Sequence, residues 1–178
     1  MGLIIYSAAI PSIVPTRACE ARLRAAHPLI AGLDEAGVGT IAGPLVAAAV
    51  MLPSEEADEG SYLPAADSKR MSRHERREAF ARLAAAPGLL WACGIVGVSD
   101  VDRLGPRHAA AAAMVVAASR LRRKARRGPL FYLVDGETVP AGLPGEAIVH
   151  GDALEASIAA ASVVAAVVHE RVMRSLAR

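Results

Sequence analysis

Aromatic residues are scarce in this sequence: Phe, Trp and Tyr together make up 3% of its 178 residues, whereas hydrophobic residues make up 53%. A core with so few rings must be built mainly from Ala, Val, Leu and Ile, and these small side chains allow helices to pack closely on a sheet. At this length we expect one domain, because each of two halves would bury too little surface to be stable.

Cysteine is also scarce. Cys19 and Cys93 do not make a disulfide framework, and no CxxC or Cys/His spacing typical of zinc sites is present. We therefore expect a reducing compartment and a cytoplasmic protein. No run approaches about 18 uninterrupted apolar residues, so we expect no membrane contact. The first 15 residues lack the basic start of a signal peptide and are interrupted by Pro11 and Pro15, so they are interpreted as an N-terminal extension.

An excess of one charge sign is nearly absent, since the formal net charge is +2. The basic residues are nevertheless grouped, within residues 17–24, 69–77 and 120–127. Grouped cations favour a polyanion such as nucleic acid, although for any one group a solvated helix face is the simpler interpretation. Residues 74–78 (HERRE) lack the second histidine of a zinc-protease motif, so they are interpreted as a charged helix face.

Hydrophobic patterning and turn signals predict the elements. We expect strands at residues 29–33, 45–52, 89–98, 130–134 and 147–149. We expect helices over residues 16–27, from a capping box at Ser72 and Glu75 to about 85, briefly from a second capping box at Ser99 and Asp102, over 107–126 and over 153–178. The first two strands should pair as a hairpin with a wide glycine-rich loop, and residues 53–67 should form an acidic surface loop. This order predicts an α/β fold, with a mixed sheet and helices on its faces.

The same pattern occurs three times: an apolar strand runs out into an acid beside glycine, at Asp34, Asp135 and Asp152. Each acid alone is more often a turn residue, because Asp-Gly is a common strand ending. Together they favour a site, since strand ends in such sheets gather ligands. With Glu35, which follows Asp34 directly, they predict a pocket of four carboxylates.

Four carboxylates repel one another, and without cations some would stay protonated. All-oxygen ligands suit Mg²⁺ or Mn²⁺ better than zinc. Two such ions about 4 Å apart can activate a water and stabilise the leaving oxygen in phosphodiester cleavage. The acids alone therefore favour a metal-dependent nuclease. The glycines at 37, 39 and 43 are one residue off a dinucleotide fingerprint, and no GK[ST] follows to make a P-loop.

With these residues in place, the chain resembles the ribonuclease HII family. DEAGVGTIAGPLVAAAV at 34–50 is similar to the family's DEAGRGPLAGPVVAAAV, and DSKRMS at 67–72 is similar to its DSKKLS. VDG at 134–136 and GDALEASIAAASVVAAVVHER at 151–171 resemble its remaining signatures. The match runs from residue 29 to about 174, in the family's order, so residues 1–27 are expected to be an extension with a short helix and residues 28–178 the catalytic domain.

The resemblance implies a ribonuclease H-like fold, a five-stranded mixed β-sheet flanked by α-helices. It implies two-metal hydrolysis of RNA strands in RNA/DNA hybrids, and of ribonucleotides embedded in duplex DNA, leaving 5′-phosphate and 3′-hydroxyl ends. The family's metal-binding acids fall on Asp34, Glu35, Asp135 and Asp152, which would hold two divalent cations, Mn²⁺ or Mg²⁺. The candidate substrate contacts are Gly37, Gly39, Ser68, Lys69 and Ser157. A monomer is expected.

Departures from the family pattern fall on the substrate side. Val38 replaces an arginine, Thr40 a proline, and His150 and Ala166 each a lysine. The sequence also stops at Arg178, before the segment that normally brings a substrate-facing tyrosine. Each lost phosphate contact should weaken binding and flatten its salt dependence. The alternative is therefore a relative that binds nucleic acid or a partner with little or no turnover; a nucleotide-binding module is a more distant one.

Overall fold

The computed structural model describes residues 14–40, 42–53, 68–125 and 128–178, so residues 1–13 of the expected N-terminal extension and nearly all of the expected acidic loop lie outside it. Five strands form one sheet in the order β3-β2-β1-β4-β5. Their bounds are β1 Ile30–Ala36, β2 Leu45–Met51, β3 Leu90–Val96, β4 Phe131–Asp135 and β5 Gly145–Ile148. β1 pairs antiparallel with β2 and parallel with β4. The sheet is therefore mixed, and the expected hairpin of the first two strands is confirmed.

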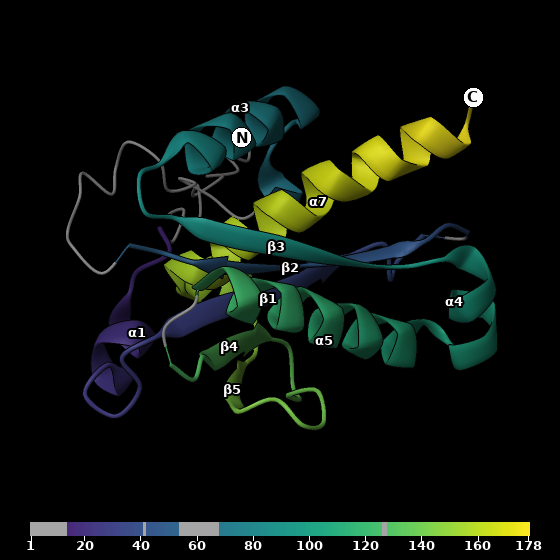
Figure 1. Cartoon of the computed structure of the whole chain (residues 1–178). Helices are drawn as coiled ribbons and strands as arrows, with labels where there is room; N and C mark the ends of the chain where they lie inside the picture. Colours follow the sequence, from purple (N-terminus) through teal and green to yellow (C-terminus); the bar gives the residue numbers. More distant parts are fainter. Residues whose placement is uncertain (1–13, 41, 54–67, 126–127) are drawn as a thin grey trace, which may run out of the picture.

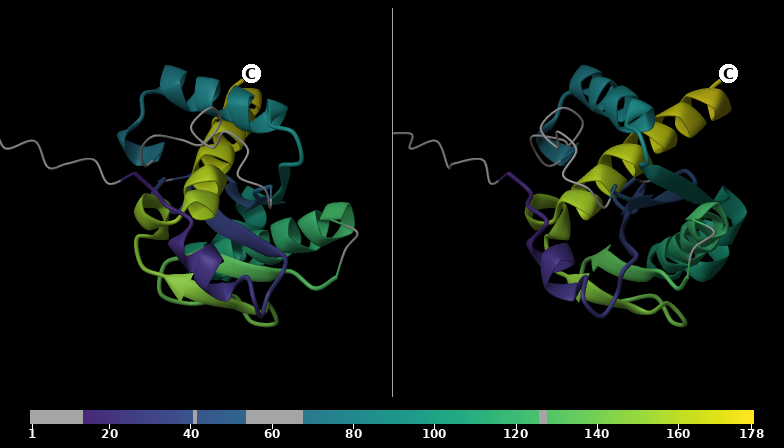
Figure 2. Two further views of the ribbon diagram at one scale, coloured as in Figure 1. Left: turned by 90° about the vertical axis from the view of Figure 1, so that its left-hand side faces the viewer. Right: turned by 60° about the vertical axis from the view of Figure 1, so that its left-hand side comes forward.

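Helices cover both faces of the sheet (Figure 1). The long helix α5, Pro106–Ala125, lies on one face, whereas α7, Ala156–Leu176, crosses the other with α3, Arg73–Ala85, beside it; Figure 2 shows the same two layers from other sides. The smaller helices are α1 Ala18–Leu23, α4 Val98–Leu104, α6 Gly151–Leu154 and the short 3₁₀ helix η1 Ser68–Arg70.

Small residues set the spacing of these layers. Alternate residues of β2 point to opposite faces, so Ala47 and Ala49 join the core under α5 while Ala48 and Val50 join the core under α7. A Cβ on Gly32 would collide with the backbone of Ser157. The start of α7 therefore lies directly against β1, as its run of small residues predicts.

Three expected boundaries are wrong in ways the structure explains. The helix near residue 99 begins at Val98 with Gly97 as its N-cap and no side-chain capping hydrogen bond, so the capping box of Ser99 and Asp102 is not formed. The capping box of Ser72 and Glu75 is formed. The expected first helix is only Ala18–Leu23, and the last is interrupted at Glu155, whose backbone is extended (φ −121°, ψ 125°), which separates α6 from α7.

By length and composition alone, one helix within the described residues, α7, would be able to cross a membrane. The core helix of a soluble protein passes the same test, and 61% of the apolar window of α7 is buried inside the fold. Its apolar character is accounted for by packing on the sheet.

Candidate active site

Two of the predicted acids lie side by side because their strands are parallel neighbours. β1 and β4 are in register with Leu33 opposite Val134, and the next residue on each strand is Asp34 and Asp135. Both strands therefore deliver a carboxylate to the same edge of the sheet. Asp34 is buried, at 2% exposure, and Asp135 is half-buried.

Asp152 reaches the same place from α6, the four-residue turn that follows β5. The backbone N–H of Gly151 donates a hydrogen bond of 2.7 Å to Oδ1 of Asp135, which joins this turn to the end of β4. One carboxylate oxygen from each of Asp34, Asp135 and Asp152 lies within 4.8 Å of the others. The convergence expected from the strand-end pattern is present for these three acids. Glu35 lies outside this group, but it lines one cavity together with Asp34 and Asp135.

Asp34, Asp135 and Glu35 are held at an electrostatic cost. Burial raises the pKa of Asp34 well above its usual range, and the charges of Glu35 and Asp135 add to this. Burial also raises the pKa of Asp135 and of Glu35, with further contributions from neighbouring carboxylates. Oδ2 of Asp34 is buried and has no hydrogen-bond partner among the described residues. A buried acceptor in a cluster of carboxylates fits a cation, since hard divalent ions take oxygen ligands.

Lys69 supplies a cation from η1. Its Nζ lies 2.7 Å from Oδ2 of Asp152, which is buried, while most of the lysine side chain is exposed. Burial alone would lower the pKa of Lys69, but its hydrogen bond to Asp152 and the nearby acidic charges raise the pKa overall. The ammonium therefore stays charged over the acid cluster.

Ser68 and its loop are fixed by residues that the sequence patterns did not single out. The hydroxyl of Ser68 lies 2.6 Å from that of Ser162 on α7. The hydroxyl of Ser162 opposes part of the rise in the pKa of Asp34. Arg76 donates to the backbone oxygens of Ser68 (3.2 Å) and Met71 (2.6 Å). Arg76 also pairs with Glu170 at 2.5 Å.

Reading residues 74–78 as a plain charged face is therefore wrong for Arg76, which joins the Ser68 loop to α3 and α7. Its neighbours in the sequence gave no signal, because the acceptors come from other segments.

Asp34, Glu35 and Asp135 line a cavity of about 280 Å³. Gly37 and Gly39 line this cavity together with Ser68 and Lys69, so four of the five candidate substrate contacts are brought together. Gly37 has a φ of +110°, and a Cβ there would come within about 3 Å of Leu45, Pro44 and His169. Only glycine fits this turn.

Ser157 is the exception among the candidate contacts. It is fully buried in the first turn of α7, against β1, and its hydroxyl has no hydrogen-bond partner among the described residues. A substrate contact through Ser157 stays a prediction, and the present conformation does not expose its hydroxyl.

Comparisons with known proteins agree with this geometry. The family model for ribonuclease HII matches residues 31–178. A ribonuclease HII of Paracoccus denitrificans is 42% identical over 161 residues, which cover 89% of this chain and 72% of that protein. The chain belongs to the ribonuclease HII family. Ribonucleases HII are endoribonucleases, so the chain is an enzyme of the nuclease class, as the resemblance implied.

Solved structures confirm the ribonuclease H-like fold. The ribonuclease H2 of Pyrococcus horikoshii OT3 is similar with a TM-score of 0.65 and 24% identity, over 83% of this chain and 75% of that one. Bst-RNase HIII, solved in complex with Mn²⁺, is similar with a TM-score of 0.67 and 19% identity, over 84% of this chain and 54% of that one. At these identities the likeness supports the fold alone.

Proposed function

We propose that this ribonuclease HII relative hydrolyses the RNA strand of RNA/DNA hybrids with two divalent cations, Mn²⁺ or Mg²⁺. The observation that carries the proposal is the convergence of Asp34, Asp135 and Asp152 on one point, with a buried oxygen of Asp34 left without a partner. The same acids would serve ribonucleotides embedded in duplex DNA.

Asp34, Asp135 and Asp152 would hold the cations, with Glu35 as a further ligand from the cavity wall. Cations bound there would polarise a water and neutralise charge on the cleaved phosphate. A water oxygen bonds to phosphorus as the bond from phosphorus to the 3′ oxygen breaks, and that oxygen takes a proton. The products are a 5′-phosphate and a 3′-hydroxyl.

Lys69 and the glycine turn handle the substrate. Lys69 lines the cavity with its ammonium 2.7 Å from Asp152, so it would place a positive charge near a phosphate of the substrate. Gly37 and Gly39 line the cavity without side chains, so their backbone groups meet the ribose. The 2′-hydroxyl, both donor and acceptor, distinguishes RNA from DNA at such a contact.

Weak binding without turnover is the second candidate, and one observation favours it. Val38 and Ala166 both line the cavity, where the family pattern has an arginine and a lysine. Two positively charged side chains of the family pattern are therefore missing from the cavity wall that would face the phosphates. Lys69 and Arg76, which also line the cavity, offset part of this loss. We further propose a cytoplasmic monomer, with residues 28–178 as the catalytic domain.

End-labelled hybrid incubated with the purified chain and Mn²⁺ separates the two candidates. We expect cleavage in the RNA strand, with products that polynucleotide kinase labels only after phosphatase treatment, as 5′-phosphates require. Binding of the hybrid with no cleavage at any Mn²⁺ or Mg²⁺ concentration would establish the second candidate instead. A duplex with a single ribonucleotide, run in parallel, tests the wider substrate range.

A further inference from the structure

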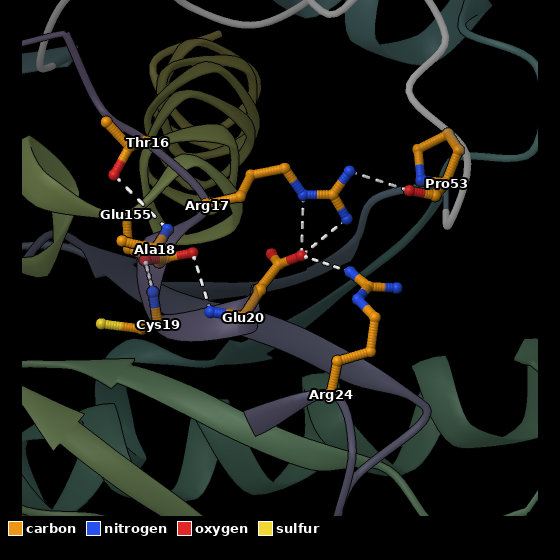
Figure 3. Close-up of polar contacts among 8 residues, drawn as sticks. All are labelled: Thr16, Arg17, Ala18, Cys19, Glu20, Arg24, Pro53 and Glu155. Atoms are coloured by element: carbon orange, nitrogen blue, oxygen red, sulfur yellow. Dashed lines mark hydrogen bonds and ion pairs between the residues drawn. The ribbon is translucent and has the colours of Figure 1, made fainter. Parts of the chain in front are cut away.

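Glu155 is a buried acid with no part in the chemistry above. It is 1% exposed and lies between α6 and α7, three residues after Asp152. Its carboxylate accepts hydrogen bonds from the backbone N–H groups of Cys19 (2.9 Å) and Glu20 (3.4 Å) at the start of α1, as Figure 3 shows. A buried carboxylate without such donors would be costly, so this contact fixes both partners.

Backbone hydrogen bonds hold the same junction from either side. The N–H of Thr16 donates to the carbonyl of Leu154 at 3.0 Å, and the N–H of Ala156 donates to the carbonyl of Thr16 at 2.7 Å. The segment before α1 is therefore paired with the residues on both sides of Glu155. This pairing also explains why the last helix is interrupted here.

Glu20, also 1% exposed, anchors α1 in turn. Its Oε2 accepts from Arg17 (2.6 Å) and Arg24 (3.1 Å), and Arg17 donates to the carbonyl of Pro53 at 3.0 Å (Figure 3). Thr16, Arg17, Glu20, Arg24 and Glu155 thus form one network, which we call the N-terminal clasp. The clasp ties α1 to the end of β2 and to the turn that carries Asp152.

The turn itself cannot hold Asp152 in place. α6 has four residues, and a single helical turn is unstable without support from its surroundings. It begins after His150, which adopts a left-handed backbone (φ 56°), and its first N–H is bound to Asp135. Its last residue precedes Glu155. The two ends of the turn are thus fixed by different contacts, one at the cluster and one at the clasp.

We propose that Glu155 is a positioning residue, which through the N-terminal clasp fixes the turn carrying Asp152 and so sets the geometry of the cation site. The proposal rests on the function given above. Outer contacts of this kind are worth about 10- to 100-fold in metal affinity when removed. Residues far from the cavity, on the N-terminal side of the first strand, would therefore control the affinity of the site.

Mn²⁺ binding by the full chain tests the proposal in Glu155→Ala, Glu155→Gln and Arg22→Ala. Arg22 is the matched control, because it lies on α1 and joins Glu146 at 2.7 Å, but both side chains are about half exposed. We expect Glu155→Ala to bind Mn²⁺ about 10- to 100-fold more weakly. Glu155→Gln, which keeps one acceptor oxygen, should show a smaller loss, and Arg22→Ala none.

Hydrogen exchange tests the role of Glu155 independently of the proposed function. Glu155→Ala should speed exchange of the amides of Ala153, Glu155 and Ala156, while the amides of α5 exchange as in the unaltered chain. If the unaltered chain binds no Mn²⁺, the proposed function fails and these exchange rates alone decide the role of Glu155. Unchanged exchange at the turn in a folded Glu155 variant, or unchanged Mn²⁺ affinity in a chain that binds it, overturns the proposal. If Glu155→Ala does not fold, the same criteria apply to Glu155→Gln.

Discussion

The ammonium of Lys69 lies 2.7 Å from a carboxylate oxygen of Asp152, directly over the group of acids that would hold a cation. The lysine is mostly exposed and the aspartate buried, so the contact joins a solvent-exposed cation to a buried acid of the cluster. In the chain without metal, Lys69 partly neutralises the cluster. A bound divalent ion has to compete with it.

Lys69→Met should therefore change two measurements in opposite directions. Mn²⁺ affinity, measured by calorimetric titration, should rise severalfold because the competing charge is gone. Affinity for an RNA/DNA hybrid should fall, because a cation facing the phosphates is lost. A decrease in Mn²⁺ affinity in this variant would show that Lys69 supports the cation site instead of competing for it.

The pH dependence of stability follows from the raised pKa values of Asp34, Asp135 and Glu35. A raised pKa in the folded state means that stability is highest below the unfolded pKa, near 4, and is lost as the pH rises through the folded values. These three acids should therefore lower the unfolding temperature of the metal-free chain at pH 8 relative to pH 5. Asp34→Asn should reduce this pH dependence.

Mn²⁺ should reverse that loss, because an ion that binds only the folded state stabilises it by mass action. The gain in melting temperature on adding Mn²⁺ should be larger at pH 8 than at pH 5. Calorimetric scans with Mn²⁺ and with EDTA provide the comparison. An equal gain at both pH values would contradict a site made of these carboxylates.

Arg76 offers a matched pair of variants, since Arg73 contacts the same acid. Arg76 is about one-fifth exposed and holds Glu170 and two backbone oxygens, whereas Arg73 is 69% exposed and lies 3.6 Å from Glu170. Arg76→Ala should lower the free energy of unfolding by about 1.5 to 3 kcal/mol, as lost hydrogen bonds to a charged group imply. Arg73→Ala should cost less than about 1 kcal/mol.

Urea unfolding measures both costs, and the Michaelis constant provides a second measurement. Because Arg76 fixes the Ser68 loop, Arg76→Ala should also raise the Michaelis constant for the hybrid. Equal costs in the two variants would mean that the loop does not depend on Arg76.

Val38→Arg should strengthen binding of the hybrid. Val38 is 40% exposed on the cavity wall, so an arginine there can reach a phosphate without displacing the core. One added phosphate contact steepens the plot of log affinity against log salt by about 0.7 to 0.9. Binding is measured in an Asp34→Asn background to prevent cleavage. Val116→Arg, on the exposed side of α5, is the control, and the same slope in both variants would contradict a specific contact.

The sequence predicted most of the acid cluster for a physical reason. Asp34 and Asp135 end apolar strands, and a buried strand pair has few ways to place its terminal acids except together. The sequence also predicted the glycine-rich loop between the first two strands, and Gly37 adopts a positive φ there, as glycine allows. The five-stranded mixed sheet followed from the resemblance, and the structure confirms it.

What the sequence could not show depends on contacts between distant segments. The last helix is interrupted at Glu155, where Thr16 pairs with the backbone on both sides, and the Glu155 carboxylate accepts from amides 136 and 135 residues away. Arg76 looks like any helix-face arginine until Ser68, Met71 and Glu170 surround it. No local sequence pattern indicates the contacts of Glu155 or of Arg76, so both could be identified only from the folded structure.

The most direct measurement of the central claim is the rate of hybrid cleavage against Mn²⁺ concentration, for the unaltered chain, Asp34→Asn and Asp135→Asn. Each variant keeps the size of the side chain but removes a charge from the cluster. We expect a metal-dependent rate in the unaltered chain and a loss of at least about 100-fold in each variant, since the cations contribute several kcal/mol to the transition state. Cleavage that is independent of metal, or undiminished in both variants, would contradict the account.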